Sequence, residues 1–256
     1  MIHPSAIIAE EVELEEGVVI GPYAVLEGPL RIGENTRIDA HAVLRGPTRI
    51  GRDNHIYPFA SIGDAPQDKK YAGEPTELVI GDRNTIREYV TINRGTVQDA
   101  GVTRVGNDNW IMAYVHIAHD CRIGDHTIFA NNASLAGHVH VDDYAILGGF
   151  TLVHQFCSIG AHAFTAFGSV IGKDVPPFVM VGGHPARPHG LNTEGLRRRG
   201  FDESAVRKLK QAYRILYREG LPFDAALERL RVLAQDSTEV QCFVEFLERR
   251  RRGILR

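Results

Sequence analysis

The sequence predicts an all-β prism of short parallel strands, followed by a helical domain. The first observation is an aliphatic residue at every sixth position, which runs without a miss from Ile8 to Ile62. The second is a small or β-branched residue four positions after most of these, as in Val12, Ala24 and Thr36. Helices bury residues with a period near 3.6 and simple strands with a period of 2, so neither accounts for a period of six. Short strands joined by sharp corners account for this period, if three hexads close one triangular coil.

The period continues to Ile171 with two interruptions, at residues 63–78 and 94–103. Both segments must leave the prism as loops, because the interior of a solenoid cannot hold irregular backbone. A loop rich in Gly, Pro, Asp and Lys on a rigid scaffold is a common place for ligand contacts. Simple tolerated insertion is the alternative.

This pattern resembles the hexapeptide-repeat family of left-handed parallel β-helices, and the resemblance covers roughly residues 2–176. It implies a left-handed β-helix over residues 1–189. The same prism serves both hydratases and transferases, so the fold by itself leaves the chemistry open.

Helical patterning begins after the repeat ends and defines a second domain at 190–256. The segment 202–220 has Asp202 as a plausible N-cap, an apolar stripe that includes Leu209 and Tyr213, and Gly220 as a stop. This domain holds 15 Lys and Arg against 10 Asp and Glu, whereas the whole chain of 256 residues has a net charge of -3. The tail is therefore the basic part of the molecule.

Composition excludes several classes. An apolar content of 43%, a charged content of 24% and the small net charge describe an ordinary soluble protein, with no nucleic-acid partner. No signal-peptide pattern and no run near the roughly 18 apolar residues of a membrane span occurs, so we expect a cytoplasmic protein without stable membrane insertion. The three cysteines form no CxxC pair, which argues against a disulfide framework or a cysteine zinc site.

Histidines carry the chemical signal, because seven of the 12 lie between His116 and His162. When the chain is wound in coils of three hexads, His119 and Gly137 stack in one column with Gln155, while Asp120 stacks beside them with His138. A base, a backbone N–H and an amide in vertical register are the groups that acyl transfer requires.

Within this column each group has an expected role. His119 is the candidate general base, Asp120 the acid that orients it, and Gly137 the oxyanion donor. No Ser or Cys nucleophile stands in the column, so direct transfer is expected instead of a covalent intermediate.

Longer motifs extend the resemblance over essentially the whole chain. In order, they are QDKKYAGEPT, AHD, NNASLAGHVHVDD, VHQF, IGAH and NTEGLRRRGF. They look like those of the UDP-N-acetylglucosamine 3-O-acyltransferase family. The resemblance implies a homotrimer with active sites between neighbouring prisms. It also implies transfer of an (R)-3-hydroxyacyl chain from acyl carrier protein to the sugar 3-hydroxyl, which opens lipid A synthesis. No metal is implied, and no cofactor beyond the phosphopantetheine of acyl carrier protein.

The resemblance assigns the same roles to His119, Asp120 and Gly137, and it adds a set of substrate contacts. These are Asp68 and Lys70 in the first loop, His116, His138, His154 and Gln155 in the cleft, and Asn192, Glu194, Arg198 and Arg199 at the nucleotide. The lysine and arginines could equally be solvated charges, and Asn192 only a helix cap. The basic tail would steer the acidic carrier protein, with solubilising charge as the alternative.

Two positions depart from the family pattern. Asn93 stands where the family typically has His, which leaves recognition of the sugar open and allows a 3-amino sugar as acceptor. Phe167 stands at a position that sets acyl length, and its bulk predicts a medium chain, nearer ten carbons than fourteen. Two further alternatives remain, a γ-carbonic-anhydrase-like metal hydratase with interface histidines on zinc and a non-catalytic trimeric binding scaffold.

Overall fold

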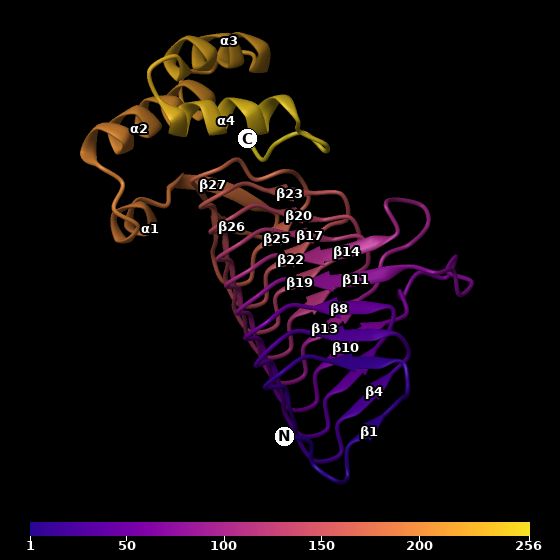
Figure 1. The fold of residues 1–256 in the computed structure, drawn as a ribbon. Coiled ribbons are helices and arrows are strands. Elements are labelled where there is room, and N and C mark those ends of the chain that lie inside the picture. Colours follow the sequence, from indigo (N-terminus) through magenta and orange to yellow (C-terminus); the bar gives the residue numbers. More distant parts are fainter.

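A computed structural model describes residues 1–256 and shows a left-handed β-helix capped by helices (Figure 1). Three parallel sheets form the faces of a triangular prism, and the chain visits faces 1, 2 and 3 in turn. Face 1 holds β1 (Ile7–Ile8), β4 (Val25–Glu27), β7 (Val43–Arg45), β10 (Ser61–Asp64), β13 (Thr91–Asn93), β16 (His116–Ile117), β19 (Ser134–Leu135), β22 (Leu152–Val153) and β25 (Val170–Ile171). The predicted fold class is confirmed.

The other two faces are built in the same way. Face 2 holds β2 (Val12–Leu14), β5 (Leu30–Ile32), β8 (Thr48–Ile50), β11 (Glu77–Ile80), β14 (Val102–Val105), β17 (Arg122–Ile123), β20 (His140–Val141) and β23 (Ser158–Ile159). Face 3 holds β3 (Val19–Ile20), β6 (Arg37–Ile38), β9 (His55–Ile56), β12 (Thr85–Ile86), β15 (Trp110–Ile111), β18 (Ile128–Phe129), β21 (Ile146–Leu147), β24 (Phe164–Thr165), β26 (Val179–Gly183) and β27 (Ala186–Leu191). We name the corners by the faces they join, as corner 1–2, corner 2–3 and corner 3–1.

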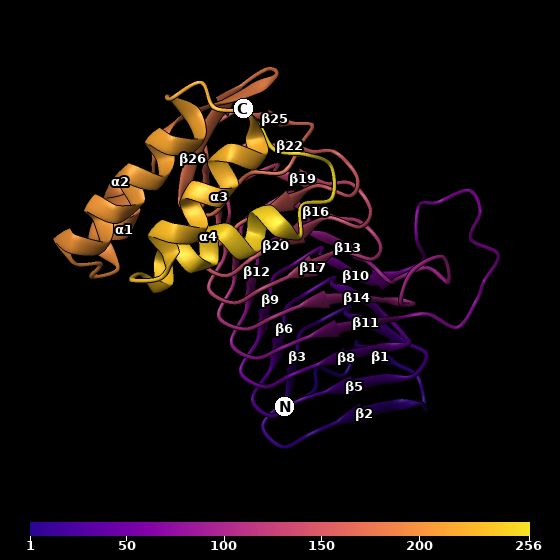
Figure 2. The same cartoon turned by 90° about the horizontal axis from the view of Figure 1, so that it is seen from above.

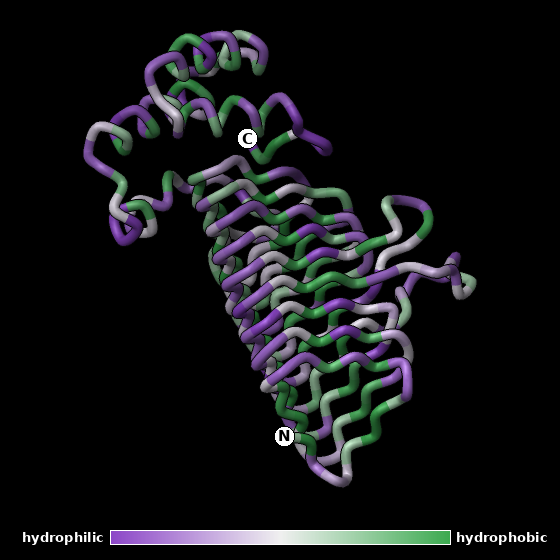
Figure 3. The backbone as a smooth tube through the Cα atoms, in the orientation of Figure 1, coloured by the Kyte–Doolittle hydropathy of each residue, from purple (hydrophilic) through white to green (hydrophobic).

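The three-hexad coil holds through the prism, as the pairing of His116 with Ser134 and of Ser134 with Leu152 shows. The aliphatic residue of each hexad points inward and is buried from Ile20 onward, whereas Ile8 and Leu14 at the open end are partly exposed. Hydrophobic and hydrophilic residues accordingly alternate along the coils (Figure 3).

Most corners place one residue in the left-handed backbone region, including non-glycine residues such as Asp120 (φ 60°) and His138 (φ 62°). This conformation costs a non-glycine residue about 1 kcal/mol. Stacking between successive coils offsets the cost, as with Tyr89 and Tyr114 on corner 3–1, whose ring centroids are 4.8 Å apart.

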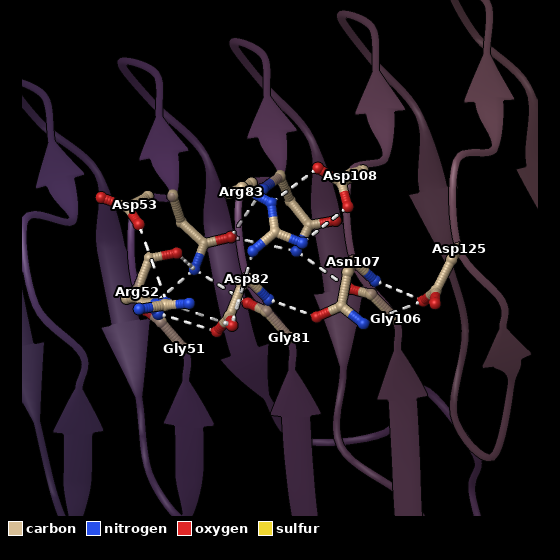
Figure 4. Close-up of polar contacts among 12 residues, drawn as sticks. Gly51, Arg52, Asp53, Gly81, Asp82, Arg83, Gly106, Asn107, Asp108 and Asp125 are labelled. Carbon is tan, nitrogen blue, oxygen red and sulfur yellow. Dashed lines mark hydrogen bonds and ion pairs between the residues drawn. The ribbon is translucent and has the colours of Figure 1, made fainter.

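Corner 2–3 contains two ladders of polar side chains. On its outside, the Asp82 carboxylate accepts from the backbone N–H of Arg52 at 3.0 Å, and Asn107 accepts from that of Asp82 at 2.8 Å (Figure 4). Inside the corner, buried asparagines fill the small position of the hexad. Asn84 accepts from the backbone N–H of Asn109 at 3.0 Å and donates to the carbonyl of Gly106 at 2.9 Å.

Both loops leave the prism at corner 1–2. Residues 65–76 connect β10 to β11, and residues 94–101 connect β13 to β14. On either side of them the ladder continues, with Ser61 paired to Thr91 and Thr91 paired to His116, so each insertion is absorbed within one coil. Figures 1 and 2 show the loops projecting from the same side.

An antiparallel hairpin of β26 and β27 closes face 3, a feature that the sequence patterning did not predict. Beyond it come α1 (Thr193–Arg198), α2 (Glu203–Tyr217), α3 (Phe223–Ala234) and α4 (Thr238–Glu248). Asp202 caps α2 by accepting from the N–H of Ala205 at 2.7 Å. None of the helices is both long and apolar enough to span a membrane.

The basic C-terminal run folds back onto the prism. Arg249 binds Asp142 at 2.6 Å, and Arg251 donates to the carbonyl of His138 at 3.3 Å. The backbone N–H groups of Arg251 and Arg252 converge on Asp174. Part of this charge therefore fastens the tail instead of standing free in solvent.

Replacing Asn84 by Ala should lower the free energy of unfolding by about 3 kcal/mol, because it leaves several buried backbone and amide groups without partners. Urea unfolding at a fixed protein concentration measures the change. The matched control, Thr85→Ala on the outward side of β12, should change stability by less than about 0.5 kcal/mol. Equal effects of the two variants would contradict a structural role for the asparagine ladder.

Candidate active site

His119 and Asp120 form a hydrogen-bonded pair at corner 1–2, directly after β16. His119 Nδ1 lies 2.8 Å from Asp120 Oδ2. The carboxylate is only 1% exposed, whereas the imidazole is 15% exposed. Water therefore reaches the ring but not the acid, which is the arrangement expected of a base and the group that orients it.

Loop 94–101 holds the buried carboxylate in place. Thr96 donates its hydroxyl to Asp120 Oδ2 at 2.6 Å and its backbone N–H to Oδ1 at 2.9 Å. Burial acts to raise the pKa of the Asp120 carboxyl, but the hydrogen bonds from His119 and Thr96 outweigh it, so the pKa lies below its ordinary value. Asp120 is thus kept ionised, and it holds the Nδ1 proton of His119.

Gly137 lies one coil above His119 and packs directly against its ring. A Cβ atom on Gly137 would lie 2.5 Å from His119 Cε1 and 2.7 Å from Nε2, so any side chain would displace the imidazole. The N–H of Gly137 donates to no acceptor within the chain. The glycine therefore leaves room for the base and presents a free donor beside it.

His138 borders the pair from the next coil. Its Nδ1 lies 3.0 Å from Asp99 Oδ2 and its Nε2 lies 3.8 Å from Asp120 Oδ2. The ring stacks on Phe156 with a centroid distance of 4.4 Å and meets His119 edge to face at 5.1 Å.

The remaining cleft residues of corner 1–2 surround this group. His116 points outward from face 1 and bonds Thr91 at 2.7 Å, and burial together with nearby His119 lowers its pKa and keeps it neutral. His154 and Gln155 are exposed one coil above Gly137. The donor atoms of His119, Asp120 and His138 lie within 4.8 Å of one another, a spacing that could also hold a divalent metal ion.

Asp68 and Lys70 lie in loop 65–76 at this same corner, with the Lys70 side chain exposed. Asp68 Oδ1 accepts from the Lys70 backbone N–H at 3.0 Å, which shapes the turn. Asn93 is 5% exposed and donates to the carbonyl of Ala65 at 2.9 Å. Asn93 therefore anchors the base of the loop.

The expected nucleotide contacts lie elsewhere, at corner 2–3. Asn192 caps α1 and donates to the carbonyl of His162 at 3.1 Å. Glu194 accepts from Arg197 and Arg198, hydrogen bonds that lower its pKa to about 2. The Arg199 guanidinium lies 4.2 Å above the ring of Tyr144. One chain therefore does not bring these groups to His119.

Phe167 occupies the third corner, 3–1, where it is 76% exposed and meets Phe150 edge to face at 5.7 Å. The three sets of predicted residues are thus distributed over all three corners of the prism.

Several neighbours of the pair were not found from the sequence. Thr96, Asp99 and Thr103 lie in or beside a loop that breaks the register, so coil counting could not place them. Tyr144 could be placed on its corner by counting, but nothing in the sequence indicated that Arg199 would fold back over it.

Prism, loops and histidine pair together define a transferase of the hexapeptide-repeat class. A bacterial transferase hexapeptide model matches residues 29–64 and 103–137, and a model described as UDP-N-acetylglucosamine O-acyltransferase, domain 2, matches 174–255. The acyl-(acyl-carrier-protein)-UDP-N-acetylglucosamine O-acyltransferase of Thiobacillus denitrificans is 66% identical over 100% of this chain and 99% of its own length. That of Alkalilimnicola ehrlichii is 63% identical over the same shares.

Solved structures agree. The UDP-N-acetylglucosamine acyltransferase of Francisella novicida has a TM-score of 0.98 at 46% identity, covering 100% of this chain and 94% of that one. The Moraxella catarrhalis enzyme has a TM-score of 0.98 at 46% identity, covering 100% and 99%. The chain belongs to the acyl-(acyl-carrier-protein)-UDP-N-acetylglucosamine O-acyltransferase family and is an acyltransferase.

Replacing Thr96 by Val should lower kcat/KM by roughly tenfold, because the Asp120 carboxylate loses a charge-assisted hydrogen bond. The pKa of Asp120 should rise toward its ordinary value. The variant should have a lower free energy of unfolding than wild type at neutral pH. This difference should shrink as the pH falls through the lowered pKa of Asp120, because a protonated carboxyl no longer gains from the hydrogen bond. Steady-state kinetics and urea unfolding from neutral to acid pH measure both effects, with exposed Val97→Ala as the control. An unchanged kcat/KM would contradict the role given to Thr96.

Proposed function

We propose that the protein transfers an (R)-3-hydroxyacyl chain from acyl carrier protein to the 3-hydroxyl of UDP-N-acetylglucosamine, the first step of lipid A biosynthesis. The observation that carries the proposal is the His119–Asp120 pair, with the His119 ring packed against Gly137. Relatives 66% and 63% identical are named acyl-(acyl-carrier-protein)-UDP-N-acetylglucosamine O-acyltransferases, which supports the donor and the acceptor.

The chemistry follows from the pair. With its Nδ1 proton held by Asp120, His119 takes the proton of the sugar 3-hydroxyl on Nε2 as the oxygen attacks the thioester carbonyl. The Gly137 N–H stabilises the oxyanion that forms. Collapse of the tetrahedral intermediate breaks the C–S bond, and His119 returns the proton to the departing thiolate. No cofactor is needed beyond the phosphopantetheine that carries the chain.

Apolar surface supports a homotrimer. The outward residues of face 3 are apolar from Trp110 upward, and Trp110 is 45% exposed. Corner 3–1 adds a column of exposed aromatic rings that includes Tyr89 (43%) and Tyr114 (55%). Exposed apolar residues gathered on one side of a protein in this way mark an interface. We place corner 3–1 at the threefold axis, with face 1 of each prism against face 3 of its neighbour.

This packing accounts for the separation of the site residues. Corner 1–2 of one prism then meets corner 2–3 of the next, so His119 of one chain shares a cleft with Asn192 and Arg199 of its neighbour. Lys70, Arg198 and Arg199 would bind the phosphates, while Asp68, His154, Gln155, Asn192 and Glu194 would hold the nucleotide and sugar. His116 and His138 would line the reacting end.

The acyl chain would run between the prisms from His119 toward Phe167. This path of the acyl chain crosses face 1, where Leu152 is 50% exposed. Phe167 would close its inner end a few coils from the base, which favours medium chains of about ten carbons at a coil spacing of about 4.8 Å. The cytoplasmic location expected from the sequence remains a prediction.

The metal-dependent hydratase left open by the sequence has one observation in its favour, since His119, Asp120 and His138 are close enough to share a cation. Against it, the relatives that are 66% and 63% identical to this chain are named O-acyltransferases. A hydratase would hold stoichiometric metal and lose activity with a chelator, whereas the proposed transfer would survive it.

Purified protein assayed with UDP-N-acetylglucosamine and 3-hydroxyacyl carrier proteins of graded length should show transfer that peaks near ten carbons. His119→Ala should reduce the rate by about 10²- to 10⁴-fold, because the general base is lost. Loss of activity with chelator, or no transfer at any length, would refute the proposal. A maximum at the longest chains would refute the role of Phe167. Preference for the 3-amino analogue of the sugar would show that the acceptor is an amine instead of a hydroxyl. If the protein binds substrate but does not turn it over, and His119→Ala leaves that binding unchanged, the protein is a binding scaffold.

Co-expressing His119→Ala chains with Arg199→Ala chains should restore about a quarter of wild-type activity. Each cleft takes His119 from one chain and Arg199 from its neighbour, and in randomly mixed trimers about a quarter of the clefts receive both residues intact. Each variant alone should be nearly inactive. Light scattering on the purified mixture verifies the trimer. If the mixture is no more active than either variant, the site is contained within one chain.

A further inference from the structure

We propose that Asp99 is a positioning residue that fixes the tautomer of His138 and thereby keeps Asp120 paired with His119. The inference rests on the proposed acyl transfer and deepens it, because it adds Asp99 to the side chains that orient the base His119.

The geometry around His138 supports this role. Asp99 Oδ2 lies 3.0 Å from His138 Nδ1, within hydrogen-bonding distance. On the other side of the ring, Nε2 lies 3.8 Å from Asp120 Oδ2, too far for a hydrogen bond. A carboxylate therefore faces each ring nitrogen, but only Asp99 is close enough to receive a proton.

The ring is also held from above and from the side. It stacks on Phe156 at 4.4 Å and meets His119 edge to face at 5.1 Å. The backbone carbonyl of His138 accepts from Arg251 at 3.3 Å. Because these contacts hold the plane of the ring, the tautomer of His138 is the property that Asp99 can still set.

Asp99 is carried by the same loop that holds Asp120. Its backbone N–H donates to the carbonyl of Thr96 at 3.3 Å, and Thr96 binds both carboxylate oxygens of Asp120. At the start of the loop, a Cβ on Gly95 would lie 2.2 Å from the backbone nitrogen of Val102, so the turn is tight. The guanidinium of Arg122 forms an ion pair with Asp99, at 3.9 Å from Oδ1. Loop 94–101 thus sets both carboxylates relative to each other.

The consequence for the base follows from the hydrogen-bonding capacity of the imidazole. A neutral imidazole has one donor and one acceptor nitrogen. In the neutral tautomer that donates from Nδ1 to Asp99, Nε2 carries no proton and cannot donate to Asp120. In the opposite tautomer, Nε2–H would compete with His119 for Oδ2, which His119 now holds at 2.8 Å. At 3.8 Å, Nε2 makes no hydrogen bond to Oδ2 in the structure. Asp99 therefore keeps Asp120 available to the base.

The test replaces Asp99 by Ala in the full-length protein. We expect kcat to fall about tenfold with KM nearly unchanged, since orientation of the base is impaired and substrate contacts are not. Gln98→Ala, an exposed neighbour on the same loop, is the control and should match wild type. Asp99→Asn, which keeps an acceptor without the charge, should recover part of the lost rate.

A double-mutant cycle separates positioning from a structural role. In a His138→Phe background, which keeps the stack on Phe156 but cannot donate, Asp99→Ala should have no further effect on kcat. ¹⁵N spectra of histidine-labelled protein should show His138 protonated on Nδ1 in wild type and on Nε2 in Asp99→Ala.

Three results would overturn the inference: an unchanged kcat in Asp99→Ala, an undiminished effect in the His138→Phe background, or the same His138 tautomer in both proteins. If the wild type itself does not transfer acyl chains, the proposed function fails. The spectra still test Asp99 in that case, because they do not depend on turnover.

Discussion

The rest of the structure depends on one constraint, the stacking of three-hexad coils through backbone hydrogen bonds. Pairing of His116 with Ser134, and of Ser134 with Leu152, repeats a spacing of about 4.8 Å along each face. Because the inward positions are filled by buried apolar side chains and by polar ones that are hydrogen-bonded within the prism, chemistry is confined to the corners and to the outward side chains. The corners in turn place equivalent residues directly above one another, so neighbours one coil apart can act together.

The candidate site uses this stacking and then departs from it. Gly137 lies over His119 because the register puts it there, and the absence of a side chain lets the ring occupy the space. Thr96 and Asp99 reach the same place by a different route, from an insertion that adds residues without disturbing the coils below and above. The solenoid supplies rigidity for the base, and the loop supplies the groups that orient it.

Separation of the predicted residues over three corners has a physical explanation in the shape of the prism. A triangular solenoid is too well filled for groups on corners 1–2 and 2–3 to meet through its interior, as the buried Ile117 and Phe129 illustrate. A neighbouring prism can bring the corners together, and the apolar outward residues of face 3 offer the surface for it. The C-terminal arginines, for their part, fasten the helical domain to the last coils.

The sequence by itself determined the prism and its three-hexad register, because a period of six buries Ile20 through Ile171 only if the chain is wound in such coils. The helical domain followed from the patterning of the tail, and the family from its resemblance in the longer motifs. The sequence also placed Asp120 and Gly137 beside His119 by counting. It located the two breaks in the register as well, but only the tertiary structure decided that Thr96 and Asp99 return to the base, that Asn93 is buried under the first loop, and that β26 and β27 close face 3. A periodic pattern carries no information about a loop's return path, because that path is set by side-chain hydrogen bonds and not by hydrophobic phase.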